Sequence, residues 1–455
     1  MTAVARTLGI RYATAARFEA PVMVPYDPAA QPGDTHGPLS PQVPGMLEQL
    51  LGVDAGSMDE DCLYLNVFRP EGAAPGADLP VLFWIHGGAY LTGGGSIGWY
   101  EGSRLAARGN VVVTINYRLG ALGFLGGGNW GTLDQICALR WVREHVGTFG
   151  GDPANVTIFG ESAGGSAVVS LLASPEAQGL FHRAWAMSPS ILQLRDLETA
   201  MRWQGVFLQH AGVDSVQAVR DLPLEAVLQA QSATIATPNT RYDMFSPAAG
   251  GNALPDDLLA AAAASPVPLS IGTNRDESLL FLAFAPDLAA ADADRWTEFA
   301  ASQFGERAAD AQALYEAARP GARPVALMAA VQTDQDFRRP AQALAEAREA
   351  AGAPTWMYWF TWASPAFGGA LGSAHALDIP FAFDNLDAPG TAMMLGDGPE
   401  LQGIANRFAD ELSGFARDGK PSWQAFDTAD RATLRIDAEV VVLLDPEPEL
   451  RALHS

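Results

Sequence analysis

Lysine is almost absent from this sequence, since Lys420 is the only one among 455 residues. A phosphate-binding P-loop needs serine or threonine after its Gly-Lys pair, and Pro421 follows Lys420 instead. A Ser-x-x-Lys nucleophile needs serine three residues before the lysine, where Arg417 stands. These two sites are therefore excluded, and a Gly-Lys-Pro turn does not provide the desolvation that a Schiff-base lysine needs.

Cysteine is nearly as scarce, because Cys62 and Cys137 are the only two. This number is too small for a disulfide framework and favours a reducing compartment, so we expect a cytoplasmic location. Residues 1–20 lack the apolar stretch of a signal peptide. None of the seven histidines begins a His-Glu-x-x-His motif, and neither cysteine belongs to a Cys-x-x-Cys pair. We expect no metal site, and nothing in the sequence implies a cofactor.

Positive charge is in short supply, with 28 basic against 52 acidic residues and a net charge of −24. Such a chain repels phosphate backbones and anionic lipids, so we expect neither a nucleic-acid nor a membrane partner. No apolar run reaches the ~18 residues that a membrane span needs. Hydrophobic residues make up 48% of the chain, as in ordinary globular proteins. The oligomeric state cannot be predicted from these features.

Short apolar runs alternate with helical stretches along the chain, which predicts an α/β protein with a mainly parallel sheet. Several runs are apolar throughout, as in strands covered on both faces. We interpret residues 1–455 as one domain, in which about 201–351 includes cap or lid helices. The predicted strands are 62–68, 81–85, 111–115, 156–159, 183–187, 267–271, 355–361 and 440–444, and the predicted helices are 133–146, 162–173, 201–211, 256–264, 337–351 and 400–417.

Two segments match Gly-x-Ser-x-Gly, the pattern of a nucleophile elbow, at 94–98 and 160–164. An elbow needs a strand directly before the serine and a helix directly after it. Ser162 has both, and the small residues after it allow the helix to pack closely. Ser96 lies in a run of glycines about ten residues after the preceding strand, which is typical of a loop. Ser162 is therefore the predicted nucleophile.

The segments around Ser162 resemble the type-B carboxylesterase family of α/β hydrolases, and within it the bacterial para-nitrobenzyl-esterase-like members. The resemblance rests on residues 149–165, on 60–68, on 116–120 and on 133–135, which occur in the family's order. It extends from about residue 9 to the C-terminus. It implies an α/β-hydrolase fold, a central mostly parallel sheet flanked by helices, with helical cap insertions.

A serine hydroxyl needs a base to take its proton and a carboxylate to orient that base. His375 is the predicted base, because it lies in a loop after a predicted strand and its segment resembles the family's catalytic histidine segment. The acid is Glu277 or its neighbour Asp276. The family pattern favours the second carboxylate, so we predict Glu277 as the acid and Asp276 as a solvated loop charge.

A glycine-rich turn follows the strand 81–85, and by resemblance the oxyanion donors are the amides of Gly88, Ala89 and Ala163. Three more residues occupy positions where the family often has a buried polar network behind the triad. The family usually carries Glu at one of them, Asp378, so its shorter side chain leaves the network in question. The three residues are Glu161, Ser188 and Asp378.

Side chains that follow the acid, Phe281, Leu282 and Phe284, either line an acyl pocket or belong to the core. Ser40 stands where the family often has the cysteine that pairs with Cys62, so we expect Cys62 to be a free thiol and Cys137 a core thiol. Residues 42–61 contain no aromatic residue, whereas the cholinesterase branch has a tryptophan there.

The predicted function is a serine carboxylic-ester hydrolase that acts on small to medium uncharged esters through an acyl-enzyme. Two alternatives remain. One is a non-catalytic interaction protein on the same fold. The other is dinucleotide binding, because residues 126–131 fit Gly-x-Gly-x-x-Gly before a helix; no clear strand precedes the first glycine, however.

Overall fold

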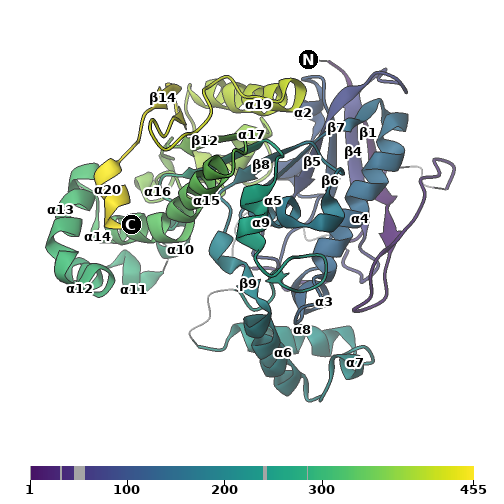
Figure 1. Ribbon diagram of the computed structural model, residues 1–455, viewed down its shortest axis with the longest axis horizontal. Coiled ribbons are helices and arrows are strands. Elements are labelled where there is room, and N and C mark those ends of the chain that lie inside the picture. Colours follow the sequence, from purple (N-terminus) through teal and green to yellow (C-terminus); the bar gives the residue numbers. More distant parts are fainter. Residues whose placement is uncertain (1, 31–32, 46–56, 239–242, 284, 455) are drawn as a thin grey trace.

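A ten-stranded sheet forms the centre of the computed structural model, which describes residues 2–30, 33–45, 57–238, 243–283 and 285–454 (Figure 1). In sheet order, the strands from β6 to β13 pair in parallel, whereas β1, β4 and β14 pair antiparallel at the two edges. The predicted mainly parallel α/β sheet is therefore confirmed. In sheet order the strands are β1 Val4–Arg11, β4 Tyr64–Pro70, β6 Val111–Ile115, β5 Leu79–Ile85, β7 Gly151–Glu161, β8 Arg183–Met187, β11 Leu269–Asn274, β12 Thr355–Phe360, β13 Thr433–Ile436 and β14 Val441–Leu443.

The central strands are buried on both faces because helices cover both faces of the sheet. Alternate side chains of β5 enter different core clusters: Phe83 joins the cluster beneath α4, α5, α9 and α15, and Trp84 joins the aromatic cluster beneath α19. This double coverage explains why these strands are apolar throughout. The helices are α4 Trp130–His145, α5 Ala163–Ala173, α9 Leu258–Ala264, α15 Arg339–Ala350 and α19 Leu401–Asp418.

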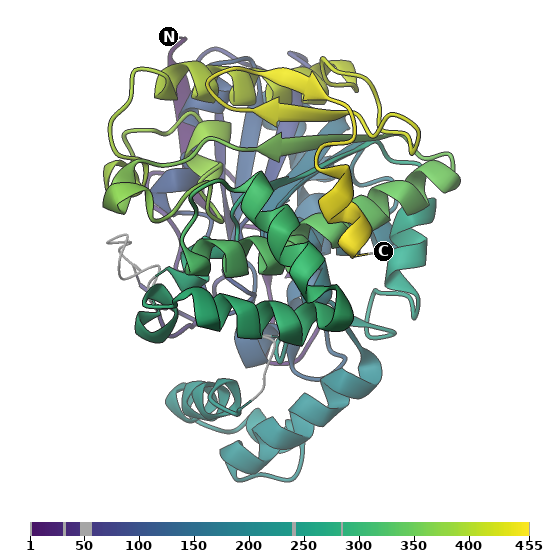
Figure 2. The same ribbon diagram turned by 90° about the vertical axis from the view of Figure 1, so that its left-hand side faces the viewer.

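Two groups of helices lie outside these layers. The first, α6 Leu197–Ala211 and α8 Leu224–Ile235, forms a lobe at the bottom of Figure 1. The second contains α12 Ala293–Phe304, α13 Ala308–Ala318 and α14 Pro324–Thr333, and the C-terminal helix α20 Pro448–Leu453 packs on it (Figure 2). A π-helical turn, η6 Asp334–Arg338, connects α14 to α15. None of the helices described is long and apolar enough to cross a membrane.

Candidate active site

Ser162 occupies the turn between the last residue of β7 and the first residue of α5. Its φ of 59° and ψ of −121° are a strained conformation for a residue with a side chain. Neighbouring glycines make the turn possible: a Cβ on Gly164 would lie 2.1 Å from the Ile85 carbonyl oxygen, and one on Gly165 would lie 2.6 Å from the Met187 carbonyl oxygen. The strand–turn–helix context predicted for Ser162 is therefore present, whereas Ser96 lies in a loop.

The glycine turn after β5 lies beside the serine. A Cβ on Gly87 would approach the Ser162 Cβ to 3.1 Å. The turn has left-handed backbone at Gly88, where φ is 103°, and at Ala89, where φ is 54°. Among the loop and turn hydrogen bonds of the described residues, none has the amide N–H of Gly88, Ala89 or Ala163 as donor. The turn thus brings its backbone close to the Ser162 side chain.

His375 is held by Glu277 through both backbone and side chain. Its Nδ1 lies 2.6 Å from Glu277 Oε2, where the ring N–H donates to the carboxylate, and its backbone N–H donates to the Glu277 carbonyl oxygen at 3.2 Å. The other carboxylate oxygen, Oε1, accepts from the Asn274 backbone N–H at 2.7 Å. All three residues are buried, so this arrangement orients the imidazole in a region closed to bulk water.

The opposite nitrogen of the ring, Nε2, lies 3.2 Å from Glu161 Oε1. Burial disfavours a charged imidazole, but the carboxylates of Glu161 and Glu277 outweigh it and raise the pKa of His375 to about 9. Burial also raises the pKa of Glu161 to about 8. Ser162 Oγ contacts Ser190 Oγ at 3.5 Å, and no hydrogen bond between Ser162 Oγ and His375 is present among the described residues.

The three residues predicted behind the triad are all buried, but no hydrogen bond joins them directly in the described part of the chain. Asp378 Oδ1 accepts from Asn274 Nδ2 at 3.3 Å, and Ser188 Oγ has no hydrogen-bond partner there. Burial, followed by the charge of Glu277, raises the pKa of Asp378 to about 7. Asp378 and Glu161 therefore interact through charge.

Asp276 is not the solvated loop charge that the sequence predicts. Its residue is only 6% exposed, and Oδ2 accepts from the Ser373 backbone N–H at 2.9 Å. The acid loop turns so that Asp276 faces the start of the His375 loop, while Glu277 faces the imidazole itself. Adjacent carboxylates thus have different partners, which their order in the sequence does not reveal.

Two aromatic rings flank the imidazole. Phe281 lies 5.5 Å from His375 between ring centroids and is 56% exposed, so it is not a core residue. Phe337, in the π-helical turn η6, lies 5.0 Å from the same ring and was not predicted. No local motif marks Phe337, because only the fold brings it to His375. Leu282 is partly buried against the aromatic core cluster, and Phe284 lies outside the described residues.

The remaining sequence predictions have simple outcomes. Cys62 and Cys137 are both buried free thiols. The glycines at 126–131 follow a short helix, α3 Gly120–Phe124, so the strand that a dinucleotide-binding turn requires is not the element before them. The geometry thus favours ester chemistry at Ser162 over nucleotide binding.

Known proteins share this architecture across the whole chain. A family model described as "Carboxylesterase family" matches residues 2–448. The para-nitrobenzyl esterase of Bacillus subtilis (strain 168) is 38% identical over 447 residues, covering 91% of this chain and 87% of its own. The phenmedipham hydrolase of Pseudarthrobacter oxydans is 34% identical, covering 89% and 85%.

Solved structures agree with these relatives. The crystal structure of a carboxylesterase from Geobacillus stearothermophilus superposes with a TM-score of 0.85 at 35% identity, covering 99% of this chain and 96% of its own. The fold is therefore that of the α/β hydrolases, as the sequence resemblance implied, and the shared chemistry is the hydrolysis of carboxylic esters. On this evidence, the chain belongs to the carboxylesterase family.

Proposed function

We propose that Ser162 is the nucleophile of this carboxylesterase, His375 its general base and Glu277 the carboxylate that orients the base. The observation that carries this proposal is the 2.6 Å contact between His375 Nδ1 and Glu277 Oε2, beside a serine in a strained elbow. The Ser162 proton passes to Nε2 as Oγ attacks the ester carbonyl. That hydrogen bond forms in the substrate complex, as catalytic hydrogen bonds often tighten only there.

The tetrahedral oxyanion is stabilised by the amides of Gly88, Ala89 and Ala163. These donors are held by backbone geometry and cost no reorganisation when charge develops on the oxygen. His375 then returns the proton to the leaving alcohol, and water hydrolyses the acyl-enzyme with the same base. Glu161, Ser188 and Asp378 form the buried polar surroundings that adjust the charge on the imidazole.

The proposed substrates are small to medium uncharged esters. Phe281 and Phe337 give the imidazole two apolar neighbours, which suits uncharged groups. The net charge of −24 disfavours nucleic acid and anionic membranes as partners, and two free thiols favour the cytoplasm. The outlying helices α6, α8 and α12 to α14 serve as the cap of a single domain.

Covalent labelling tests the proposal. A fluorophosphonate should modify one residue per chain, and peptide mass spectrometry should locate the adduct on Ser162. A panel of p-nitrophenyl esters from acetate to octanoate, with butyrylcholine as the charged comparison, defines the substrate class. Labelling of another serine would refute the assignment, and an unlabelled protein without esterase activity would favour the non-catalytic interaction protein.

A further inference from the structure

The loops that carry Glu277 and His375 are joined by a reciprocal pair of hydrogen bonds that does not involve either residue's side chain. The Asp276 backbone N–H donates to the Ser373 carbonyl oxygen at 2.9 Å, and the Ser373 backbone N–H donates to Asp276 Oδ2 at 2.9 Å. Gly372 lets the loops approach, since a Cβ there would lie 2.6 Å from Asp276 Oδ2. Asp276 therefore fixes the spacing of two loops that are distant in sequence.

Asp276 is in turn held by arginines. Arg275 Nη2 lies 3.0 Å from Asp276 Oδ2, and Arg319, the residue after α13, places Nε 3.5 Å from Oδ1. The Arg319 side chain is only 10% exposed. A charge in such a position needs compensating partners. Its second partner is Glu447, whose Oε1 accepts from Arg319 Nη1 at 2.7 Å.

Glu447 is the residue before the C-terminal helix α20 and has left-handed backbone with a φ of 57°. Arg338 of η6 also donates to its carboxylate, and Arg338 Nη2 donates to the Pro446 carbonyl oxygen at 3.0 Å. The Arg338 guanidinium lies 4.0 Å above the ring of Trp359 in β12. The start of α20 is thus bound on several sides to the elements that surround the triad loops.

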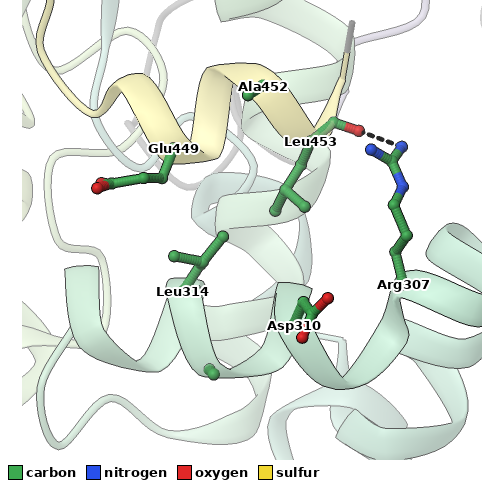
Figure 3. Close-up of a pocket in the computed structure, with 7 residues that line it drawn as sticks. Arg307, Asp310, Leu314, Glu449, Ala452 and Leu453 are labelled. Atoms are coloured by element: carbon green, nitrogen blue, oxygen red, sulfur yellow. Dashed lines mark hydrogen bonds between the residues drawn. The ribbon is translucent and has the colours of Figure 1, made fainter.

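The far end of α20 is attached differently. An open hollow of about 540 Å³ lies between α13 and α20. At its edge Arg307 Nη2 donates to the Leu453 carbonyl oxygen at 2.8 Å, the hydrogen bond drawn in Figure 3. In the part of the chain that the structure describes, Arg307 makes no hydrogen bond or ion pair with the triad loops. The exposed Arg307 and the largely buried Arg319 therefore both tie the α20 segment to the α13 region, but of the two only Arg319 also contacts Asp276.

We propose that Asp276 is a positioning residue for the esterase reaction, held in place by Arg319 at the end of α13, which is itself paired with Glu447 at the start of the C-terminal helix. The inference rests on the proposed roles of Glu277 and His375. Asp276 sets the separation of the two loops, so that the Nδ1 contact with Glu277 leaves Nε2 aimed at the nucleophile. A shift of about 1 Å in such a group slows the reaction by up to ~100-fold without touching substrate.

The test separates alignment from folding by following fluorophosphonate labelling of Ser162. The endpoint counts the competent sites, and the rate constant reports how well the triad is aligned. For Asp276→Ala we expect a rate constant lower by ~10- to 100-fold with an endpoint near that of the wild type. Asp276→Asn should recover at least about tenfold over alanine, because its amide oxygen still accepts from the Ser373 N–H.

Arg319→Met keeps the apolar stem and removes the charge, and we expect it to slow labelling by roughly threefold to tenfold. Arg307→Met is the control for the attachment of α20 itself: it loosens the far end of this helix and should label within about twofold of the wild-type rate. If Asp276→Ala does not fold, Arg319→Met alone decides the question.

The inference would be overturned by wild-type rates for Asp276→Ala and Arg319→Met, by no recovery in Asp276→Asn, or by equal slowing in Arg307→Met. Failure of the wild-type protein to label at Ser162 would instead overturn the proposed function. A lower endpoint with an unchanged rate constant would show that Asp276 only stabilises the fold, and would also overturn the inference.

Discussion

The two sides of the active site are built by different means. On the nucleophile side, backbone geometry does the positioning: Ser162 has a positive φ, and Gly87 and Gly164 allow approaches that any Cβ would block. On the acid–base side, buried side chains position the base, because His375 lies between the carboxylates of Glu277 and Glu161. The first side is therefore sensitive to added volume, and the second to changes of charge.

The two sides also differ in how far apart in the sequence their positioning elements lie. Ser162 is positioned by elements that are its immediate neighbours in sequence, β7 and α5. His375 depends on a partner 98 residues away. Substitutions that add volume on the nucleophile side should affect folding and catalysis together, whereas changes of charge on the acid–base side should mainly affect titration and rate.

The largest expected effect is loss of the nucleophile itself. Ser162→Ala should lower kcat for p-nitrophenyl acetate by on the order of 10⁴-fold or more, because no hydroxyl remains to attack the carbonyl. The protein should stay folded, as judged by circular dichroism. Ser96→Ala, in the other Gly-x-Ser-x-Gly segment, should hydrolyse the ester at the wild-type rate. Ester hydrolysis by Ser162→Ala at a rate near that of the wild type would contradict the assignment of Ser162 as the nucleophile.

Next comes added volume on the nucleophile side. Gly164→Ala should destabilise the protein by about 3 kcal/mol, because its Cβ would lie 2.1 Å from the Ile85 carbonyl oxygen, and backbone cannot move aside cheaply. A fall in the urea midpoint measures the effect. Gly205→Ala in α6 is the control, since nothing lies within 4 Å of its added Cβ, and it should raise stability by up to about 1 kcal/mol. Equal midpoints would contradict the volume argument.

A smaller effect concerns charge on the acid–base side. The base must be neutral to accept a proton, so activity is present above its pKa and is lost as pH falls through it. With the pKa of His375 raised to about 9, kcat/KM should still rise between pH 7 and 9. Glu161→Gln removes one of the charges that raise this pKa. The rising limb of the kcat/KM–pH profile should therefore move down by about one pH unit, toward the ordinary imidazole pKa.

The measurement is kcat/KM for an uncharged ester between pH 5 and 10. Glu176→Gln, an exposed ion-pair residue, is the matched control and should leave the limb in place. An unchanged limb in Glu161→Gln would mean that the 3.2 Å contact with Nε2 does not govern the base.

The smallest effect is expected from the cysteines, which lie on the nucleophile side but have no role in its geometry. Burial raises the pKa of Cys62 to about 12 and that of Cys137 to about 11, so thiolate is scarce at pH 8. Dithionitrobenzoate should leave native activity unchanged, and denatured, unreduced protein should release two equivalents of thionitrobenzoate. Rapid inactivation of the native enzyme would show that a thiol lies closer to the reaction than its burial indicates.

The nucleophile side could be predicted from local sequence because its determinants are local. The strand before Ser162, the glycines after it and the helix are all contained in residues 156–173. The acid–base side needed the family resemblance, and even so Asp276 was wrongly predicted as solvated. Burial of Asp276 and the approach of Phe337 depend on contacts between distant segments, for which the sequence has no local pattern.

In the sheet, too, strands with a local sequence pattern were predicted and strands without one were missed. Apolar central strands such as β6 were predicted at their observed positions. The edge strand β1 and the strand β13 were missed, because both contain exposed or half-buried positions with arginines and so lack a continuous apolar run. The run at 440–444 was predicted as a strand and forms the antiparallel edge β14. Helices α12 to α14 were recognised only as a helical region.

The order of strands in the sheet has a consequence for the growing polypeptide. From β7 onward each new strand of the ten-stranded sheet lies beside the previous strand of that sheet, so the sheet extends in one direction as the ribosome delivers the chain. The half of the sheet that carries Ser162 is therefore complete while the most recently made strand still has an unpaired, apolar edge. In the described part of the chain, the three-residue strand β14 is the last to pair, and it covers the edge of β13. Chaperone demand should therefore be highest before β13 and β14 have been synthesised.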